Sequence, residues 1–167
     1  HTFLRSAGIE NHKLKSFDEK GVTLYGEHST SLRMSDLGYT NDNQRKINIC
    51  YNSLDTYLKG LVEAISTRDC EWSKIGVLVD GEYKQLNDCL LQIENEYYGA
   101  IRPKQVANSG ESPSHALRFR GVQYIELRSL DVNPYSPVGI SSEQIHFLDV
   151  FLSWCLLNES SSCSVLA

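Results

Sequence analysis

The sequence has no long apolar run and no leader-like start. Its longest apolar stretches are the length of one strand or one buried helix, whereas a membrane span needs roughly 18 or more apolar residues in a row. The opening residues, His1 to Arg5, include no initiator Met and no apolar signal-peptide core. We therefore expect no membrane span and no signal peptide, and the start is typical of the middle of a longer polypeptide or of a trimmed chain.

Positive charge is also scarce. Sixteen Lys and Arg stand against 21 Asp and Glu, which gives a net charge of −5, and the basic residues do not gather into a stripe. A nucleic-acid partner or an anionic membrane surface requires a net basic face. We therefore expect neither as a partner.

Motifs for metals, disulfides and nucleotides are lacking as well. The cysteines are odd in number and widely spaced, with no CxxC pair. This pattern argues against a zinc site and a disulfide framework, and it favours reduced thiols in a cytoplasmic protein. There is no HExxH, P-loop, GxGxxG or GxSxG. The five cysteines are Cys50, Cys70, Cys89, Cys155 and Cys163.

The composition that is present is that of an ordinary globular protein. The chain has 167 residues, of which 41% are hydrophobic and 22% charged, enough for one domain with a buried core. We expect a single domain over residues 1–167. Residues 1–28 are polar and are expected to be a loop, or a segment that packs on a missing part. Residues 29–43 are rich in small and polar residues and are expected to be mostly loop. The Ser-rich tail 158–167 is expected to fray.

The clearest helix signal follows Asn52 and Ser53. Apolar residues recur there at helical spacing on a single stripe, which predicts a helix that ends near residues 66–68. The stripe consists of Leu54, Tyr57, Leu58, Leu61, Val62 and Ile65.

Two more helices have local start signals. Ser112-Pro113 places proline at a first helical position and predicts a short helix that stops at Gly121. Ser141 and Gln144 form a capping-box pattern ahead of an apolar segment through Cys155. The two tryptophans, Trp72 and Trp154, are expected in the core.

Strands are predicted between these helices. Lys74–Val79 and Glu82–Leu86 flank Asp80-Gly81, a strong signal for a type I′ hairpin turn. A third strand is expected over Cys89–Ala100, broken at Arg102-Pro103, and a fourth over Val122–Leu130. Helices combined with a partly antiparallel sheet predict the α+β class.

The fourth strand carries the most informative chemistry. Period-two alternation places Tyr124, Glu126 and Arg128 on one face. The carboxylate can bind a divalent cation through oxygen, and the guanidinium can clamp an anionic oxygen. The alternative is a solvated face with cross-strand ion pairs, which the spacing alone favours.

Two other polar groups are weaker candidates. Glu94, Glu96 and Tyr98 would share a face of the third strand, and adjacent carboxylates suggest a metal or a cationic neighbour, although a solvated strand face fits equally well. Arg33 and Tyr39 fall in an expected loop, where binding residues tend to gather. The residues alone lead no further than an α+β domain with a candidate anion or metal face.

Three segments carry longer and more specific motifs: TSLRMSDLGYTN at 30–41, LQIENEYYGAIRPK at 91–104, and SGESPS at 109–114 leading into YIELRSLD at 124–131. In order and spacing they resemble the glutamate–cysteine ligases of the γ-proteobacterial type, over about residues 29–157. The resemblance implies a glutamine-synthetase-like carboxylate–amine ligase fold, with a mainly antiparallel curved sheet and flanking helices. It also implies that ATP phosphorylates the γ-carboxylate of glutamate, that the amine of cysteine displaces phosphate, and that Mg²⁺ assists the transfer.

The resemblance also assigns roles to individual residues. Glu126 resembles the family's metal-ligating glutamate, and Arg128 resembles the arginine that steadies the phosphoryl oxygens. Arg33 resembles a substrate-carboxylate arginine, while Tyr39 and Tyr98 resemble the tyrosines that bind the cysteine carboxylate. Glu94 and Glu96 keep a structural interpretation, and no nucleotide-binding residue is assigned.

The chain also departs from the family. Family members are much longer, and most of their metal-binding carboxylates precede the region that matches here. The chain is therefore expected to be the central fragment of a ligase, inactive by itself, with the remainder of the ligase as a partner. A catalytically inactive binding or structural module of the same fold is the alternative, and a different carboxylate–amine ligase is a third hypothesis.

Overall fold

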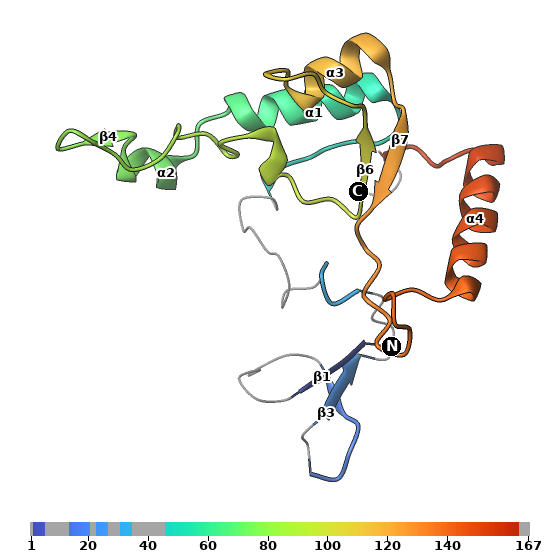
Figure 1. The fold of residues 1–167 in the computed structure, drawn as a ribbon. Coiled ribbons are helices and arrows are strands. Elements are labelled where there is room, and N and C mark those ends of the chain that lie inside the picture. Colours follow the sequence, from blue (N-terminus) through green and yellow to red (C-terminus); the bar gives the residue numbers. More distant parts are fainter. Residues whose placement is uncertain (1, 6–13, 21–22, 27–30, 35–45, 164–167) are drawn as a thin grey trace. The chain divides into compact units, whose positions relative to one another are not determined.

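The computed structural model describes residues 2–5, 14–20, 23–26, 31–34 and 46–163 (Figure 1). The chain divides into two compact units, one formed by residues 1–40 with 127–131 and the other by residues 41–126 with 132–167. Helices and short antiparallel sheets occur together, which confirms the α+β class. Compact units can belong to one domain, so the expectation of a single domain over residues 1–167 stays a prediction.

The first unit contains a three-stranded antiparallel sheet. Its strands are β1 (Thr2–Arg5), β2 (Lys15–Ser16) and β3 (Thr23–Gly26), in the order β1-β3-β2. The Asp18 carboxylate shapes the turn into β3, because it accepts hydrogen bonds from the backbone N–H groups of Lys20 and Thr23 at 3.0 and 2.6 Å. The expectation of a loop over residues 1–28 was therefore wrong for these strands, which are too short to show a clear alternation in the sequence.

The core of the second unit lies between two helices that Figure 1 shows side by side. Helix α1 (Leu54–Ser66) starts at Ser53, which forms a capping box with Thr56. Helix α3 (Pro113–Arg120) starts at the N-cap Ser112 and ends at Gly121, whose positive φ of 72° suits glycine. Both helices confirm the sequence prediction. Their buried contact is made by Tyr57, Leu58, Leu61 and Leu117.

The predicted hairpin exists but is much shorter than expected. Strands β4 (Leu78–Val79) and β5 (Glu82–Tyr83) flank Asp80 and Gly81, with φ of 53° and 81°, as a type I′ turn requires. The start of the predicted first strand is instead helical, since α2 spans Cys70–Ile75. The buried Asp69 caps that helix by accepting from the N–H groups of its first turn, and this local cap outweighs the strand propensity.

The strand predicted over Cys89–Ala100 is absent from this fully described segment. A short 3-10 helix, η2 (Glu94–Glu96), lies there instead, so Glu94, Glu96 and Tyr98 do not share a strand face. The backbone N–H groups of Leu90 and Leu91 donate to the end of α1, at Thr67 and Ala64, and they are not available for a strand ladder.

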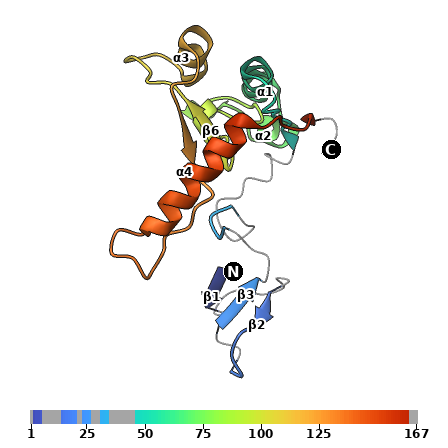
Figure 2. The same ribbon diagram turned by 90° about the vertical axis from the view of Figure 1, so that its right-hand side faces the viewer.

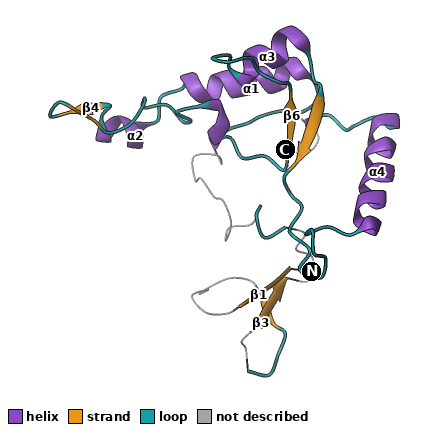
Figure 3. Cartoon of the chain, viewed as in Figure 1, coloured by secondary structure: helices purple, strands orange, loops and turns teal. Residues whose placement is uncertain are grey.

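A strand does form further along the chain, and it contains Pro103, which was expected to end the predicted strand. β6 (Ile101–Lys104) pairs with β7 (Tyr124–Leu127) in a two-stranded sheet, where each strand has a free edge that can carry proline. β7 is shorter than the predicted strand, so Arg128 lies one residue beyond its end. Figure 3 distinguishes the strands, in orange, from the helices, in purple.

Helix α4 (Ser142–Leu157) confirms the third helix prediction, including the capping box of Ser141 and Gln144. Figure 2 shows α4 from the side as one continuous helix. None of its residues is buried, and within the described chain it makes no extensive contact with another helix or strand. Trp154, expected in the core, is 59% exposed. None of the described helices is long and apolar enough to cross a membrane.

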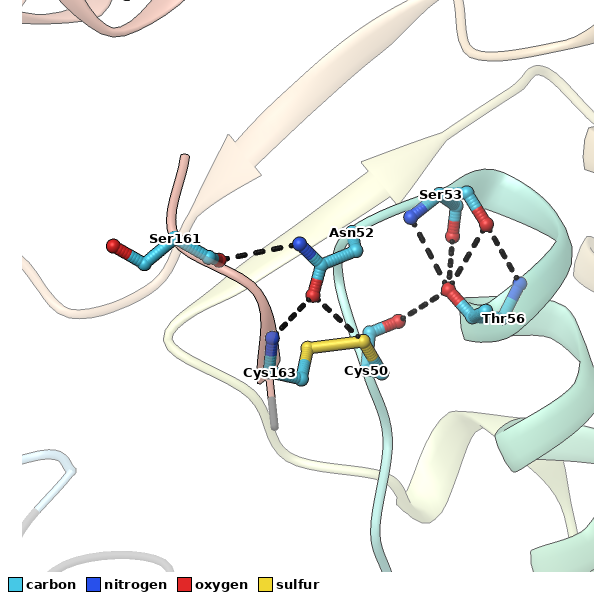
Figure 4. The surroundings of a disulfide bond; sticks show 6 residues. All are labelled: Cys50, Asn52, Ser53, Thr56, Ser161 and Cys163. Carbon is cyan, nitrogen blue, oxygen red and sulfur yellow. Dashed lines mark hydrogen bonds between the residues drawn. A yellow bond between two sulfur atoms is a disulfide. The ribbon is translucent and has the colours of Figure 1, made fainter. Parts of the chain in front are cut away.

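A disulfide joins Cys50, just ahead of α1, to Cys163 near the end of the chain (Figure 4). Asn52 supports this closure. Its side-chain oxygen accepts from the Cys163 N–H at 2.7 Å, and its amide donates to the Ser161 carbonyl at 3.2 Å. The expectation of five reduced thiols was therefore wrong for this pair, which lies 113 residues apart. The tail was expected to fray, yet residues 161–163 are tied to the start of α1.

Candidate functional site

Glu126 lies on β7 with its side chain 38% exposed. Its Oε2 atom is 3.5 Å from Nζ of Lys104 on the partner strand β6. A cross-strand ion pair is what the alternative interpretation of this strand anticipated. A carboxylate is an oxygen ligand of the kind that Mg²⁺ prefers, although the ammonium of Lys104 competes with a cation at this position.

Arg128 lies just after β7 and belongs to the other compact unit, with residues 127–131. Its Nε and Nη1 atoms are buried. A guanidinium with buried nitrogen atoms interacts more strongly with an anion than one in water, because the local dielectric constant is lower.

Asp131 connects the segment of Arg128 to that of Arg33. Its carboxylate accepts hydrogen bonds from Ser31 Oγ at 3.0 Å and from the N–H groups of Leu32 and Arg33 at 2.7 and 3.3 Å. Arg33 and Arg128 therefore lie in segments that one carboxylate ties together. Asp131 had no predicted role, although the residue closes the YIELRSLD motif.

Tyr98 is half-buried and follows Tyr97, which belongs to a network of tyrosine hydroxyls. The Tyr51 hydroxyl donates to the Ile101 carbonyl at 3.0 Å, so it accepts from the Tyr97 hydroxyl at 3.2 Å. Burial raises the pKa of Tyr51 strongly and also raises that of Tyr57. These phenols therefore stay protonated and act as neutral hydrogen-bond groups.

The close packing of this network explains the glycine that follows Tyr98. A Cβ atom at Gly99 would collide with the Tyr51 hydroxyl. The nearby Arg102 is 9% exposed and donates to the Glu94 carbonyl at 3.0 Å. Spacing in the sequence could not reveal this network, because Tyr51 and Tyr97 are 46 residues apart in the chain and meet only in the fold.

The two weaker carboxylates have structural roles. Glu94 accepts hydrogen bonds from the N–H and hydroxyl of Ser114 in the first turn of α3, where a negative charge suits the helix dipole. Glu96 accepts from the Gln92 N–H at 2.7 Å. These bonds favour the structural interpretation of both residues over a metal pair.

The five candidate residues are thus distributed over the chain as follows. Arg33 and Arg128 belong to one compact unit, and Glu126 and Tyr98 belong to the other. Tyr39 lies outside the described residues. Among the residues that the structure describes, no group of three or more His, Cys, Asp or Glu side chains could hold a metal ion.

A surface hollow of about 490 Å³ lies elsewhere, beside the β4–β5 hairpin. None of the candidate residues lines it, so it does not add to the site. Its lining residues are Tyr83, Lys84, Gln85, Leu86 and Gln92.

Comparison with known proteins connects these residues to one family. The family model described as glutamate-cysteine ligase matches residues 1–165. A glutamate–cysteine ligase of Vibrio parahaemolyticus is 60% identical over 144 residues, which are 86% of this chain and 28% of the relative. One of Shewanella pealeana is 54% identical over 161 residues, 95% of this chain and 31% of the relative.

A solved structure extends the similarity to three dimensions. The crystal structure of a glutamate–cysteine ligase from Francisella tularensis in complex with AMP matches with a TM-score of 0.79 and 42% identity. The match covers 96% of this chain and 32% of the Francisella chain. The chain therefore spans about a third or less of the length of the relatives that it matches.

Proposed function

Because this chain belongs to the glutamate–cysteine ligase family, we propose that it forms the central, substrate-binding part of an enzyme that joins L-glutamate to L-cysteine, the first step of glutathione biosynthesis. In the proposed reaction, ATP phosphorylates the γ-carboxylate of glutamate, and the amine of cysteine displaces phosphate from γ-glutamyl phosphate. The AMP held by the Francisella relative supports a nucleotide substrate. The proposed parent fold is the glutamine-synthetase-like carboxylate–amine ligase fold.

The proposal assigns the two arginines to anionic groups of the substrates. Arg128 would stabilise the oxygens of the phosphoryl group during transfer, since its buried nitrogen atoms suit a developing negative charge. Arg33 would bind a substrate carboxylate, for which a planar guanidinium is suited. The Asp131 carboxylate accepts hydrogen bonds from residues 31–33 and so joins the segment of Arg128 to that of Arg33. This is the single observation that best supports a shared role for the two arginines.

Glu126 would contribute one oxygen ligand to Mg²⁺, which neutralises charge on the transferring phosphoryl group when bound. The described residues fit such a site only in part. Glu126 is a single carboxylate with Lys104 Nζ at 3.5 Å, and the described chain holds no cluster of metal-ligating side chains. A hard, octahedral cation needs further oxygen ligands, which the remainder of the ligase would supply.

Tyr98, together with Tyr39, would hydrogen-bond the carboxylate of the cysteine substrate. The tyrosine network and Gly99 would hold the Tyr98 backbone in place. The proposed partners are therefore the small-molecule substrates and the rest of the ligase, with no nucleic acid or membrane partner, and the proposed location is the cytoplasm.

A chimera tests the proposal directly. In the Vibrio parahaemolyticus ligase, the matched 144 residues are replaced by the corresponding residues of this chain. We expect the chimera to form γ-glutamylcysteine in the presence of ATP, and we expect no measurable activity from the 167-residue chain alone. A folded but inactive chimera would instead favour the binding or structural module.

Within the chimera, Arg128→Ala should lower kcat/KM by roughly 10³-fold, about 4 kcal/mol of transition-state stabilisation, because a charge that faces the phosphoryl group is lost. Arg118→Ala is the matched control, since Arg118 is an exposed arginine of α3. Steady-state kinetics with both variants make the comparison. Equal turnover of the Arg128 and Arg118 variants would remove Arg128 from the mechanism.

A further inference from the structure

Helix α4 exposes a continuous line of large apolar side chains. Phe147, Val150, Phe151 and Trp154 recur at i, i+3, i+4 and i+7, which places them on one face of the helix. Their exposed fractions are 66%, 71%, 44% and 59%. We call these four residues the aromatic stripe of α4.

The stripe is ordered by its own ring contacts. The ring centroids of Phe147 and Phe151 lie 5.7 Å apart, and those of Phe151 and Trp154 lie 6.2 Å apart, with nearly parallel planes in both pairs. Leu148 and Leu152, on a different side of the helix, are half-buried. The four residues of the stripe are therefore more exposed than the two leucines on the other side of the same helix.

Charge is absent from the stripe and sparse around it. Helix α4 carries two acidic residues, Glu143 and Asp149, and no Lys or Arg. Aromatic enrichment together with depletion of charge is the signature of the central part of a protein interface. A contiguous apolar patch of this kind marks an interaction site, because isolated soluble proteins rarely leave one in water.

The length of the related chains offers an occupant for the stripe. The match to the Francisella structure includes 96% of this chain, which leaves too few residues outside it to omit α4, yet it uses 32% of that chain. About two thirds of the relative's polypeptide therefore lies outside the matched region and is available to cover α4. That polypeptide belongs to the same enzyme and can supply an apolar surface at high effective concentration.

We propose that the aromatic stripe of α4 is the surface on which the remainder of the ligase polypeptide docks, through an apolar segment whose rim is neutral or basic where it meets Glu143. The inference rests on the proposed function only in taking this chain as part of a ligase. It assigns α4 to an internal interface of the enzyme.

Hydroxyl-radical footprinting with residue-level mass spectrometry tests the proposal. Modification of Phe147 and Trp154 is compared between the 167-residue chain and the Vibrio chimera described above. We expect at least about a fivefold decrease at both residues in the chimera. Equal modification in the two proteins would overturn the proposal.

Light scattering of the 167-residue chain tests whether a second copy of the chain, and not the rest of the ligase, covers the stripe. If the chain alone is a dimer in which Trp154 is already protected, a second copy covers the stripe and the proposal fails. A monomer with a reactive Trp154, combined with protection in the chimera, supports it.

Substitutions on α4 give an independent comparison. Phe151→Ser in the chimera should lower the melting temperature clearly more than it does in the isolated chain, whereas Ser153→Ala, on the polar side of the same helix, should change neither. The footprint of the unsubstituted chimera decides the matter if Phe151→Ser does not fold. Because these measurements do not use turnover, an inactive chimera with a protected stripe contradicts the proposed function and leaves the docking surface in place.

Discussion

Glu111 is the most strongly perturbed carboxylate of the described chain. It accepts hydrogen bonds from Arg120 Nη1 and Nη2 at 2.9 and 2.6 Å and from the Asn108 N–H at 2.8 Å, and its Oε1 lies 2.8 Å from His115 Nδ1. The Arg120 guanidinium, followed by the Asn108 N–H and His115, holds the pKa of Glu111 far below its ordinary value of 4.5. The residue thus joins the loop before α3 to the end of that helix.

This perturbation predicts a pH dependence of stability. Since the folded-state pKa is depressed, the ionised carboxylate stabilises the fold fully above about pH 4.5, and this contribution is lost as the pH falls below that value. Glu111→Gln should therefore reduce stability at pH 7, and the difference from the unsubstituted chain should shrink in acid. Urea unfolding of both proteins at pH 7 and pH 3 measures this difference in the free energy of unfolding.

Glu82→Gln serves as the control, because Glu82 is exposed and pairs with Lys84 on the surface of the hairpin. It should change stability little at either pH. A Glu111→Gln variant with the same loss at both pH values would contradict the ionic explanation.

Individual site residues could be anticipated only in part from the sequence. Alternation placed Glu126 in a strand correctly, whereas the roles proposed for the site residues come from the resemblance and stay predictions. The Lys104 partner of Glu126 and the bridging carboxylate of Asp131 could not be anticipated, because both depend on contacts between segments distant in the chain.

At the scale of elements, signals contained within a few residues were reliable. The caps Ser53, Ser112 and Ser141 each satisfy N–H groups of the turn that follows, so neighbouring residues alone define these helix starts. Strands were predicted poorly because their partners are distant. The Cys89–Ala100 segment has strand-like alternation, but Leu90 and Leu91 donate their backbone bonds to the end of α1, and Glu96 and Tyr97 donate theirs within the segment.

The cap of α1 gives a prediction at this scale. Ser53→Ala removes the side-chain acceptor of the Thr56 N–H and should lower the free energy of unfolding by about 1 kcal/mol. Thr67→Ala, at the other end of α1, keeps the backbone bond to Glu63 and should have a smaller effect. Chemical denaturation of both variants is the measurement, and a larger loss for Thr67→Ala would contradict the assignment of the cap.

At the scale of the whole molecule, the disulfide is the feature that the sequence hid most completely. An odd cysteine count and wide spacing suggested free thiols, whereas Cys50 and Cys163 meet because α1 and the tail are brought together by the fold. Cysteine pairing is a property of tertiary structure, and Cys70, Cys89 and Cys155 remain reduced.

The bridge should make a large contribution to stability. Because it closes a loop of 113 residues, its removal in Cys163→Ser should cost up to about 5 kcal/mol by the loop-entropy estimate. Denaturation with and without dithiothreitol measures this, and the reductant should abolish the difference between the variant and the parent. Cys155→Ser, at an exposed free thiol, should be neutral. An unchanged midpoint for Cys163→Ser without reductant would show that the bridge does not stabilise the chain.

The same bond determines how the chain would respond to mechanical force. If its two ends were pulled apart, tension would pass through the sulfur atoms, and the polypeptide between residues 50 and 163 could not lengthen. Chemical reduction would release that hidden length, roughly 400 Å of extended chain at about 3.5 Å per residue. Helices α1, α3 and α4 are thereby shielded from stretching as long as the sulfur atoms stay joined.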